Sequence, residues 1–301
     1  MKIIAAISAT SLLIMDSCSF ENFSRMNSAA VKKILRVAKN FAVIYNQKNF
    51  LRGESMKRIF VEDVTGEAIK ISGGDANHLA RSLRARRGDR LTAVDGAGNC
   101  AVVELIDFDK ATITARRVSE IQRVVSERKI ILADCLPKQN RFDNIIEKAT
   151  ELGVDQIEPL ISERTIARPN SLREKSKLER WNKIAKEAAE QCARDTIPAI
   201  GNIRALDDWL KEISPLADDS LFLFCWERET ATTVRKILSD YRNSGGTGKI
   251  FVLIGPEGGF SDDEAHKIKS AGGVSVTLGN RVLKTDTAAI SVLAMINYEL
   301  M

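Results

Sequence analysis

The second half of the chain alternates between apolar runs and amphipathic stretches, and this pattern predicts strands that are each followed by a helix. Near-continuous apolar runs predict strands at 129–136, 156–161, 220–226, 249–255 and 274–279. Apolar residues at three- and four-residue spacing predict helices at 141–152, 171–194, 230–242, 261–271 and 285–300. Strands that alternate with helices are typical of a parallel α/β sheet.

Residues 56–126 have a different pattern, because their apolar runs are short and separated by turn residues. KRIFVE and KATITARRV are predicted strands, DANHLARSLRA is a predicted short helix, and Asp95-Gly96 marks a hairpin. We expect a small β-barrel domain over 56–126, followed by the α/β domain over 127–301. We expect the predicted helix to carry a cluster of arginines, Arg81, Arg84, Arg86, Arg87 and Arg90, of which the first four are candidates for RNA backbone contact. A solvated helix face is the alternative.

Charge changes this picture little. The formal net charge of the 301 residues is +5, but residues 1–55 alone contain eight Lys/Arg against three Asp/Glu, which accounts for the whole surplus. Any nucleic-acid site in the main body is therefore a local patch.

Residues 1–18 resemble a secretion signal except that Asp16 disrupts the cleavage pattern near Cys18. We interpret 1–55 as an extension that is disordered or precedes the true start, with a basic arm or targeting segment as the alternative.

The cysteine pattern favours a reduced, cytoplasmic protein. The five cysteines are scattered, without a CxxC pair, and the chain has two histidines to assist them. A disulfide framework or a zinc site is not the expected use of such residues. We expect no metal and no membrane partner.

The stretch LIGPEGGFSDDE at 253–264 places glycines between a predicted strand and a predicted helix with a capping box, Ser261 and Glu264. Such loops bring backbone close to ligands, and we expect Gly258 either to approach a ligand or to adopt a positive φ. The spacing fits neither the P-loop nor the dinucleotide fingerprint, and Glu257 would repel an anion. The predicted ligand is neutral or cationic; a plain turn is the alternative.

A second glycine loop, LGNRVLKTDTAA, also runs from a predicted strand into a helix, which we expect Thr285 to cap. Two such loops can form opposite walls of one crevice at the carboxyl edge of a parallel sheet. Neither wall has the lysine-serine pair that binds a triphosphate, and Glu257 and Asp286 both favour a cation such as a sulfonium.

These two loops, with IIEKATELGVDQIEPLISERT and RWNKIAKEAAEQCARDTIP upstream, resemble the RsmE family of ribosomal RNA uridine-N3 methyltransferases, in the SPOUT superfamily. The resemblance spans residues 56–300. It implies a PUA-like β-barrel followed by a parallel α/β domain with a C-terminal trefoil knot, S-adenosylmethionine as cofactor, and 16S ribosomal RNA or the small ribosomal subunit as partner. It also implies a homodimer, in which the apolar helix 288–296 would lie between subunits; burial within one domain is the alternative.

The resemblance implies roles for individual residues. Arg281 would stabilise the target nucleotide, and Asp286 is a candidate base, although it could simply complement the helix dipole. Arg164 and Arg194 would face RNA, or else pair with Glu163 and Glu190. The expected cofactor-binding residues are Trp226, Glu227, Gly255, Pro256, Glu257, Gly258, Leu278, Gly279, Leu283 and Thr287.

The chain departs from the family pattern at four positions. Pro is usual where Asn280 stands, Arg where Lys284 stands, Glu where Asp286 stands, and Gly where Gln139 follows Pro-Lys. A non-catalytic ribosome-assembly factor that binds RNA, or an enzyme that uses an adenine nucleotide, are the alternatives to a methyltransferase.

Overall fold

The computed structural model describes residues 57–82, 84–95, 99–109, 112–121, 128–168 and 171–300. The N-terminal extension predicted over 1–55 lies outside these residues, as do the turn of the hairpin at 96–98 and the predicted domain boundary, which falls within 122–127. No helix among the described residues is long and apolar enough to cross a membrane.

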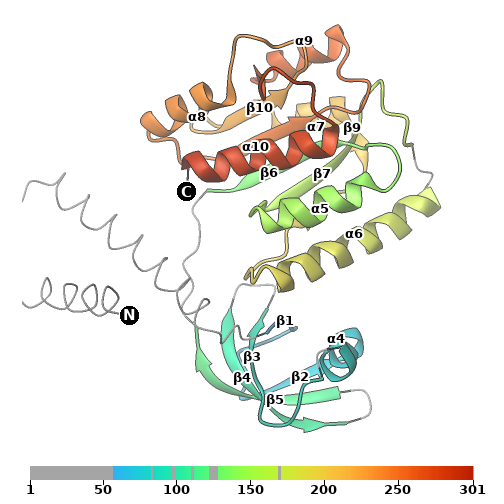
Figure 1. Ribbon diagram of the computed structural model, residues 1–301, viewed down its shortest axis with the longest axis vertical. Helices are drawn as coiled ribbons and strands as arrows, with labels where there is room; N and C mark the ends of the chain where they lie inside the picture. Colours follow the sequence, from blue (N-terminus) through green and yellow to red (C-terminus); the bar gives the residue numbers. More distant parts are fainter. Residues whose placement is uncertain are drawn as a thin grey trace, which may run out of the picture. The chain divides into compact units, whose positions relative to one another are not determined.

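The first part of the described chain is a five-stranded sheet with strand order β1-β3-β4-β5-β2 (Figure 1). Its strands are β1 (Arg58–Phe60), β2 (Ala68–Ser72), β3 (Arg90–Val94), β4 (Cys100–Phe108) and β5 (Thr112–Glu120). The predicted hairpin is confirmed, since β3 and β4 pair antiparallel and Asn99 donates its backbone N–H to Asp95 Oδ1 at 2.8 Å. Alternate residues such as Ile69 and Ile71 of β2 point into an apolar core.

The helix of this part is shorter than predicted. It consists of α4 (Gly73–Asn77) and a π-helical turn, η1 (His78–Ser82). Only Arg81 of the arginine cluster lies on it; the arginines from Arg84 to Arg87 follow in the loop that leads to β3. The expectation of an arginine-studded helix face is therefore wrong, and the positive φ of 51° at Arg84 marks the point where the chain leaves helical geometry.

The second part is a seven-stranded sheet with the order β12-β10-β11-β6-β7-β8, and β9 also pairs with β7. Every pairing in it is parallel, as predicted. The strands are β6 (Ile130–Cys135), β7 (Gln156–Ile161), β8 (Ala199–Ile200), β9 (Arg204–Ala205), β10 (Leu221–Cys225), β11 (Ile250–Ile254) and β12 (Val274–Val276).

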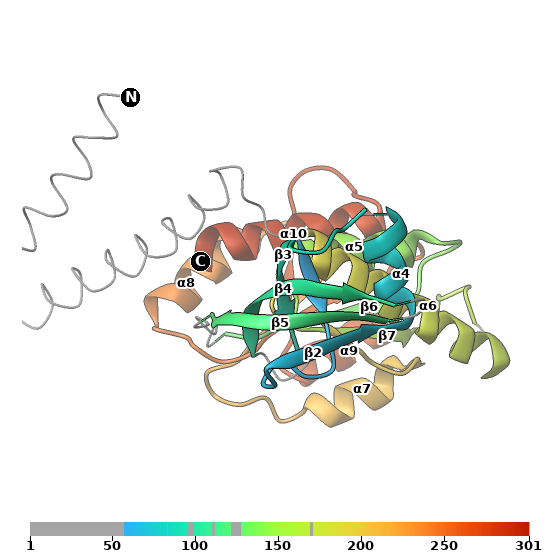
Figure 2. The same ribbon diagram turned by 90° about the horizontal axis from the view of Figure 1, so that it is seen from below.

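Helices cover both faces of this sheet, which explains why its strands are apolar runs without polar alternation (Figures 1 and 2). One face packs against α5 (Arg141–Glu151), α6 (Ser171–Gln191), α8 (Val234–Asn243) and α10 (Thr285–Leu300). The other face packs against α7 (Leu206–Ile213) and α9 (Asp262–Ser270). The expected fold class, a parallel α/β domain preceded by a small β domain, is confirmed.

Some elements were not predicted. The helix α7 has buried residues at three- and four-residue spacing, Leu206, Trp209 and Leu210, but it is only eight residues long. The strands β8 and β9 have two residues each, too few for a periodic signal. The helix predicted at 230–242 begins instead at Val234, where the Thr233 side chain accepts the N–H of Lys236.

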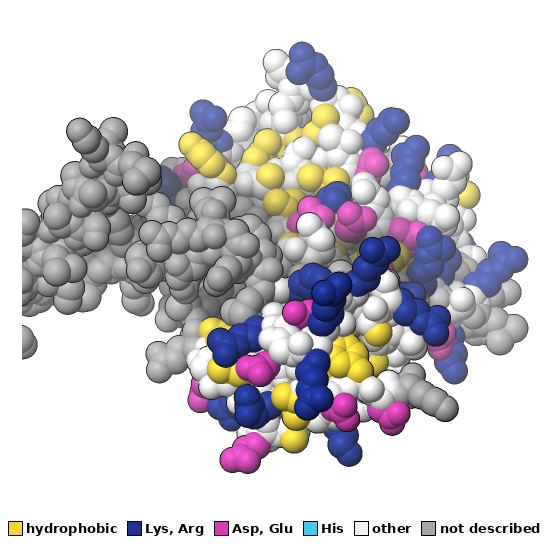
Figure 3. Space-filling view, turned by 60° about the horizontal axis from the view of Figure 1, so that its bottom comes forward, with side chains coloured by type: hydrophobic (Ala, Val, Ile, Leu, Met, Phe, Trp, Pro, Cys, Tyr) yellow, Lys and Arg dark blue, Asp and Glu magenta, His cyan; other side chains and the backbone are white. Residues whose placement is uncertain are grey.

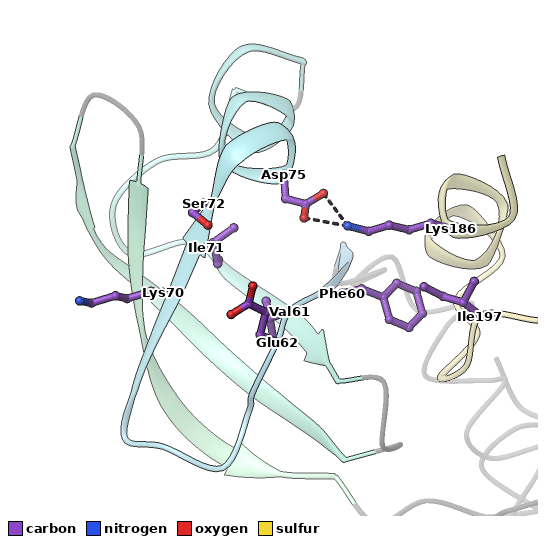
Figure 4. A pocket seen from close by; sticks show the side chains of 9 residues that line it. All are labelled: Phe60, Val61, Glu62, Lys70, Ile71, Ser72, Asp75, Lys186 and Ile197. Carbon is purple, nitrogen blue, oxygen red and sulfur yellow. Dashed lines mark hydrogen bonds and ion pairs between the residues drawn. The ribbon is translucent and has the colours of Figure 1, made fainter. Parts of the chain in front are cut away.

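The helix α6 packs against the five-stranded sheet. Ala189 of α6 shares an apolar cluster with Phe60 and Val94, and Lys186 donates to both carboxylate oxygens of Asp75 at 2.8 and 2.7 Å. Figure 4 shows this ion pair at the rim of a hollow, next to Phe60 and Ile197. Glu62 and Lys70 also line this hollow, and both are exposed.

Candidate functional site

The candidate site lies at the carboxyl edge of the seven-stranded sheet. Because all strands run in one direction, the segments that follow β6, β7, β10, β11 and β12 leave the sheet at the same edge. The strand β11 lies between β6 and β10, so its loop, residues 255–261, has the other segments on both sides. The loop that carries the first glycine motif is therefore at the centre of the edge.

The 255–261 loop is a fixed turn. Gly259 donates its N–H to the carbonyl of Pro256 at 2.9 Å, which closes a turn with Glu257 and Gly258 at its centre. The next residue, Gly259, has φ +65°, and a Cβ placed there would lie 2.3 Å from a carboxylate oxygen of Glu227. The positive φ expected at Gly258 is therefore at Gly259, one residue later, because the turn itself uses ordinary backbone angles.

The helix that follows the loop begins with the predicted capping box. The Ser261 hydroxyl accepts the N–H of Glu264, and the Glu264 carboxylate accepts the N–H of Ser261. The other carboxylate oxygen of Glu264 accepts the N–H of Glu163 at 2.7 Å, which joins the segment after β7 to this helix start. With Phe260 fully buried, the loop is held on both sides.

Arg164 lies across the same loop. Its guanidinium donates to the carbonyls of Gly258 at 2.9 Å and Phe260 at 3.5 Å, and its Cβ would lie 3.1 Å from a Cβ at Gly258. The side chain remains exposed. The structure thus gives Arg164 a supporting role for the loop; contact with RNA stays a prediction.

The segment after β6 meets the loop from the other side. The Lys138 backbone N–H donates to Glu257 Oε1 at 2.9 Å, and the Arg141 guanidinium lies 3.7 Å from the same oxygen. Gln139, where glycine is usual in the family, has φ +60°. The backbone therefore keeps the left-handed conformation that glycine would adopt freely, at a cost of about 1 kcal/mol for a residue with a Cβ.

The second glycine loop and the start of α10 complete the edge. Gly279 has φ +120°, which only glycine adopts readily, and the Thr277 hydroxyl lies 3.1 Å from its carbonyl and 3.2 Å from its N–H. Arg281 follows, exposed to solvent, together with Val282. Leu278 and Leu283 pack their side chains against the core on the α10 face.

The prediction that Thr285 caps α10 is wrong. Thr285 is the first helical residue, and its buried hydroxyl has no hydrogen-bond partner. Asp286 follows in the first turn, with one buried carboxylate oxygen also unpartnered. Thr287, the next residue, is exposed.

Sequence reasoning missed one residue of the site. Asp134, the fifth residue of β6, is fully buried, and neither of its carboxylate oxygens has a hydrogen-bond partner. Burial raises the pKa of Asp134 well above its usual range, and the negative charges of Glu257 and Asp286 raise it further. The signal in the sequence is a single charged residue within the apolar run KIILADCL.

Trp226 lies on the other side of the sheet from Leu278. Its ring packs against the core beneath α9, with Lys269 Nζ 4.9 Å and the Arg228 guanidinium 5.9 Å from the ring centroid. Its indole N–H is buried without a partner. Glu227, the next residue, lies against Gly259, so the segment after β10 also reaches the central loop.

Some of the buried polar atoms without partners belong to residues at this edge of the sheet: the oxygens of Asp134, Thr285 and Asp286, and, on the opposite face beneath α9, the indole N–H of Trp226. Buried polar groups in native proteins are nearly always hydrogen-bonded, so exceptions at the carboxyl ends of parallel strands, where α/β proteins bind ligands, make this edge the candidate ligand site. The donor set is backbone, carboxylate, hydroxyl and indole, which suits an organic cation with a polar heterocycle. Among the described residues no three His, Cys, Asp or Glu side chains are arranged to hold a metal ion.

The other predicted RNA-binding arginines lie away from this edge. Arg81, Arg84, Arg86 and Arg87 are all exposed on the five-stranded part, and the structure records no ion pair between any of them and another described residue. Figure 3 shows lysine and arginine side chains spread densely over this face of the molecule, with carboxylates between them.

Arg194 has a structural role. Its guanidinium donates to the carbonyls of Thr150 and Val154 at 2.9 and 2.7 Å, where α5 ends. The Thr150 carbonyl belongs to the last turn of α5 and Val154 to the segment after it, so Arg194 ties the end of this helix to the start of the next segment. Contact between Arg194 and RNA stays a prediction.

Comparison with known proteins defines the class. A family described as an RNA methyltransferase domain matches residues 125–297, and one described as an RNA methyltransferase PUA domain matches residues 71–116. The first match covers more than half of the chain and includes every loop of the candidate site.

Individual relatives give the family. A ribosomal RNA small subunit methyltransferase E from Synechocystis is 30% identical over 241 residues, which cover 78% of this chain and 75% of the relative. The protein of the same name from Bacillus subtilis is 29% identical over 253 residues, 81% of this chain and 97% of the relative. A crystal structure of the Neisseria gonorrhoeae protein of that name, bound to S-adenosyl methionine, has a TM-score of 0.71 and 28% identity, and covers 81% of this chain and 97% of that one. The chain belongs to the ribosomal RNA small subunit methyltransferase E family.

The turn geometry predicts that Gly259 tolerates substitution less well than Gly258. Gly259→Ala is expected to lower the free energy of unfolding by about 1–3 kcal/mol, because it forces a Cβ into the left-handed region and against Glu227. Gly258→Ala is the matched control and should lose less, since Gly258 does not have a positive φ and its Cβ would lie 3.1 Å from the Arg164 Cβ. Denaturant titration of both variants measures the difference; equal losses would contradict the assigned turn.

Proposed function

We propose that the chain transfers a methyl group from S-adenosylmethionine to N3 of a uridine in 16S ribosomal RNA. The observation that carries this proposal is the cluster of unpartnered buried polar atoms at the carboxyl edge of the sheet, at the start of α10. Membership of the family supports the reaction class. The target is then the small ribosomal subunit or its RNA, and the place of action is the cytoplasm.

The cofactor pocket on this proposal is formed by the two glycine loops and the segment after β10. Gly258 and Gly279 are exposed and Gly255 is half-buried, so their backbone groups can approach a ligand. Apolar contacts come from Pro256, Leu278 and Leu283, and polar contacts come from the remaining members of the predicted set: Trp226, Glu227, Glu257 and Thr287. Bound there, S-adenosylmethionine supplies an electrophilic methyl group on a positively charged sulfur.

The protein residues then prepare the uridine. Asp286 at the start of α10 accepts the proton of uridine N3, which leaves an anion shared between N3 and the neighbouring carbonyl oxygens. Arg281, exposed on the adjacent loop, stabilises this anion. Holding both reactants in one orientation supplies about 7–11 kcal/mol of the barrier.

RNA affinity comes from the five-stranded part on this proposal, through Arg81, Arg84, Arg86 and Arg87. Arg164 is exposed next to the central loop and can contact the nucleotide while it supports that loop. Arg194 contributes little to RNA affinity, because its guanidinium already donates to the carbonyls of Thr150 and Val154 and is only partly exposed beside α5.

The outer face of α10 supports a homodimer. Ala289, Val292 and Leu293 are buried in the α/β domain, so the helix packs within its own subunit, yet Tyr298 is 89% exposed and Met295 is 39% exposed. A second copy of the chain would cover these apolar residues.

Asp286→Asn separates catalysis from binding. If Asp286 is the base, this variant should bind S-adenosylmethionine and RNA nearly as tightly as the unchanged protein and lose at least about 100-fold in methyl transfer. Binding is measured by calorimetry, and transfer by mass mapping of methylated uridine in 16S RNA. An unchanged rate would contradict the assigned base, and binding of ATP in place of S-adenosylmethionine would contradict the proposed function.

The arginine loop is tested by charge reversal. Changing Arg84, Arg86 and Arg87 together to Glu should weaken RNA binding and flatten its dependence on salt, since each duplex phosphate contact contributes about 0.9 to the log-log slope. Cofactor affinity should stay constant. Unchanged RNA affinity would show that these residues are a solvated surface.

The dimer is tested at Tyr298. The double change Met295→Glu and Tyr298→Glu should convert the protein to a monomer in light scattering coupled to gel filtration, because it places charges in an apolar contact. Lys183→Glu on the exposed face of α6 is the control. If the unchanged protein is already monomeric, the proposed homodimer is contradicted.

A further inference from the structure

Asp134 ends an apolar stripe on the face of the sheet that packs against α5, α6, α8 and α10. In the strand register it lies beside Ile254, which lies beside Cys225, and Cys225 lies beside Val276. The preceding residue on the same face of β6 is Leu132, which is also fully buried. The Asp134 carboxylate therefore occupies a position surrounded by apolar side chains, and it has no contact with solvent.

Nothing in the described part of the protein compensates for this carboxylate. Both oxygens lack a hydrogen-bond partner, and burying such a group costs several kcal/mol unless it is paired or protonated. The chain retains this cost at the end of a strand that opens into the ligand crevice. A native structure keeps such a group where a ligand completes it.

The charged groups that face Asp134 are all acidic or neutral. Glu257 of the central loop and Asp286 of α10 add negative charge around it. The thiols of Cys225 and Cys135 are neutral, since burial and the nearby Asp134 charge raise their pKa values, to about 12 for Cys225. The Arg141 guanidinium lies 3.7 Å from Glu257 Oε1, and no ion pair is recorded for Asp134 or Asp286 among the described residues. The crevice therefore has a deficit of positive charge.

We propose that Asp134 is a buried counter-charge for the sulfonium of S-adenosylmethionine, through which the pocket distinguishes this cationic cofactor from its uncharged thioether product. The inference rests on the proposed function and adds a residue to its cofactor site. A sulfonium has no N–H or O–H, so it cannot be recognised by hydrogen-bond acceptors in the usual way. A carboxylate that lacks hydrogen bonds and sits among apolar residues offers charge alone, which matches this chemistry.

A proton accompanies this recognition. In the ligand-free protein the raised pKa keeps Asp134 protonated to a higher pH than an exposed aspartate, so the folded chain holds a proton that the unfolded chain has released. Stability contributed by this group is therefore greatest at low pH and falls as pH rises above the unfolded pKa of about 4. A cation in the pocket favours the carboxylate, and the proton leaves to solvent. Affinity for the sulfonium should then increase with pH, whereas affinity for the thioether should not.

The test compares two ligands on two variants by calorimetry. Asp134→Asn keeps the shape and removes the charge, and it should weaken binding of S-adenosylmethionine by about ten- to a hundredfold while changing S-adenosylhomocysteine affinity by less than about threefold. Asp263→Asn is the matched control, because it removes an exposed carboxylate from α9, which starts at the same edge of the sheet. It should change neither affinity.

A second measurement needs no variant. Titration of the unchanged protein with each ligand between pH 5 and 9, in two buffers of different ionisation enthalpy, should show proton release with the sulfonium ligand only. If Asp134→Asn lowers the affinity for both ligands equally, Asp134 interacts with the amino group that both ligands share, and the inference is overturned. A ratio of the two affinities that does not change with pH would also overturn it. Failure of the unchanged protein to bind either ligand would overturn the proposed function itself.

Discussion

The parallel insertion of β11 between β6 and β10 is the constraint on which the rest of the structure depends. It places the 255–261 loop between the segments that leave both neighbouring strands, so Lys138, Glu227 and Arg164 all reach it from different elements. It also requires every strand residue to be buried on one face or the other. Asp134 is exceptional among the buried carboxylates of this sheet, because Glu158 of β7 accepts hydrogen bonds from Gln156 and Arg204 whereas Asp134 has no hydrogen-bond partner.

Much of this architecture follows from the sequence. Buried parallel strands leave continuous apolar runs, and long helices leave three- and four-residue spacing, so the succession from β6 to α10 is predictable. The capping box at Ser261 and Glu264 is predictable as well, because it is made by residues three apart in the chain. Interactions between residues that are close in the chain can be predicted from the local sequence.

What escaped prediction depends on contacts between distant segments or on single backbone angles. The positive φ belongs to Gly259 and not Gly258, because the hydrogen bond to Pro256 sets the register of the turn. Arg194 serves the end of α5, some 40 positions earlier, which no local pattern indicates. Asp134 is visible in the sequence as a single charged residue in an apolar run, but its complete burial without a hydrogen-bond partner depends on segments that are distant in the chain.

The arginine loop of the five-stranded part and the carboxylates at the edge of the α/β part carry opposite charges, and on the proposed function they recognise different ligands. Exposed arginines of the five-stranded part suit an RNA backbone, whereas the crevice of the α/β part is lined by carboxylates. On the proposed function, the crevice would repel the phosphates of the same RNA that the arginines attract. The target nucleotide must therefore present its base to Asp286 and keep its phosphate outside, near Arg281. The acidic lining that favours a cationic cofactor thereby also orients the substrate.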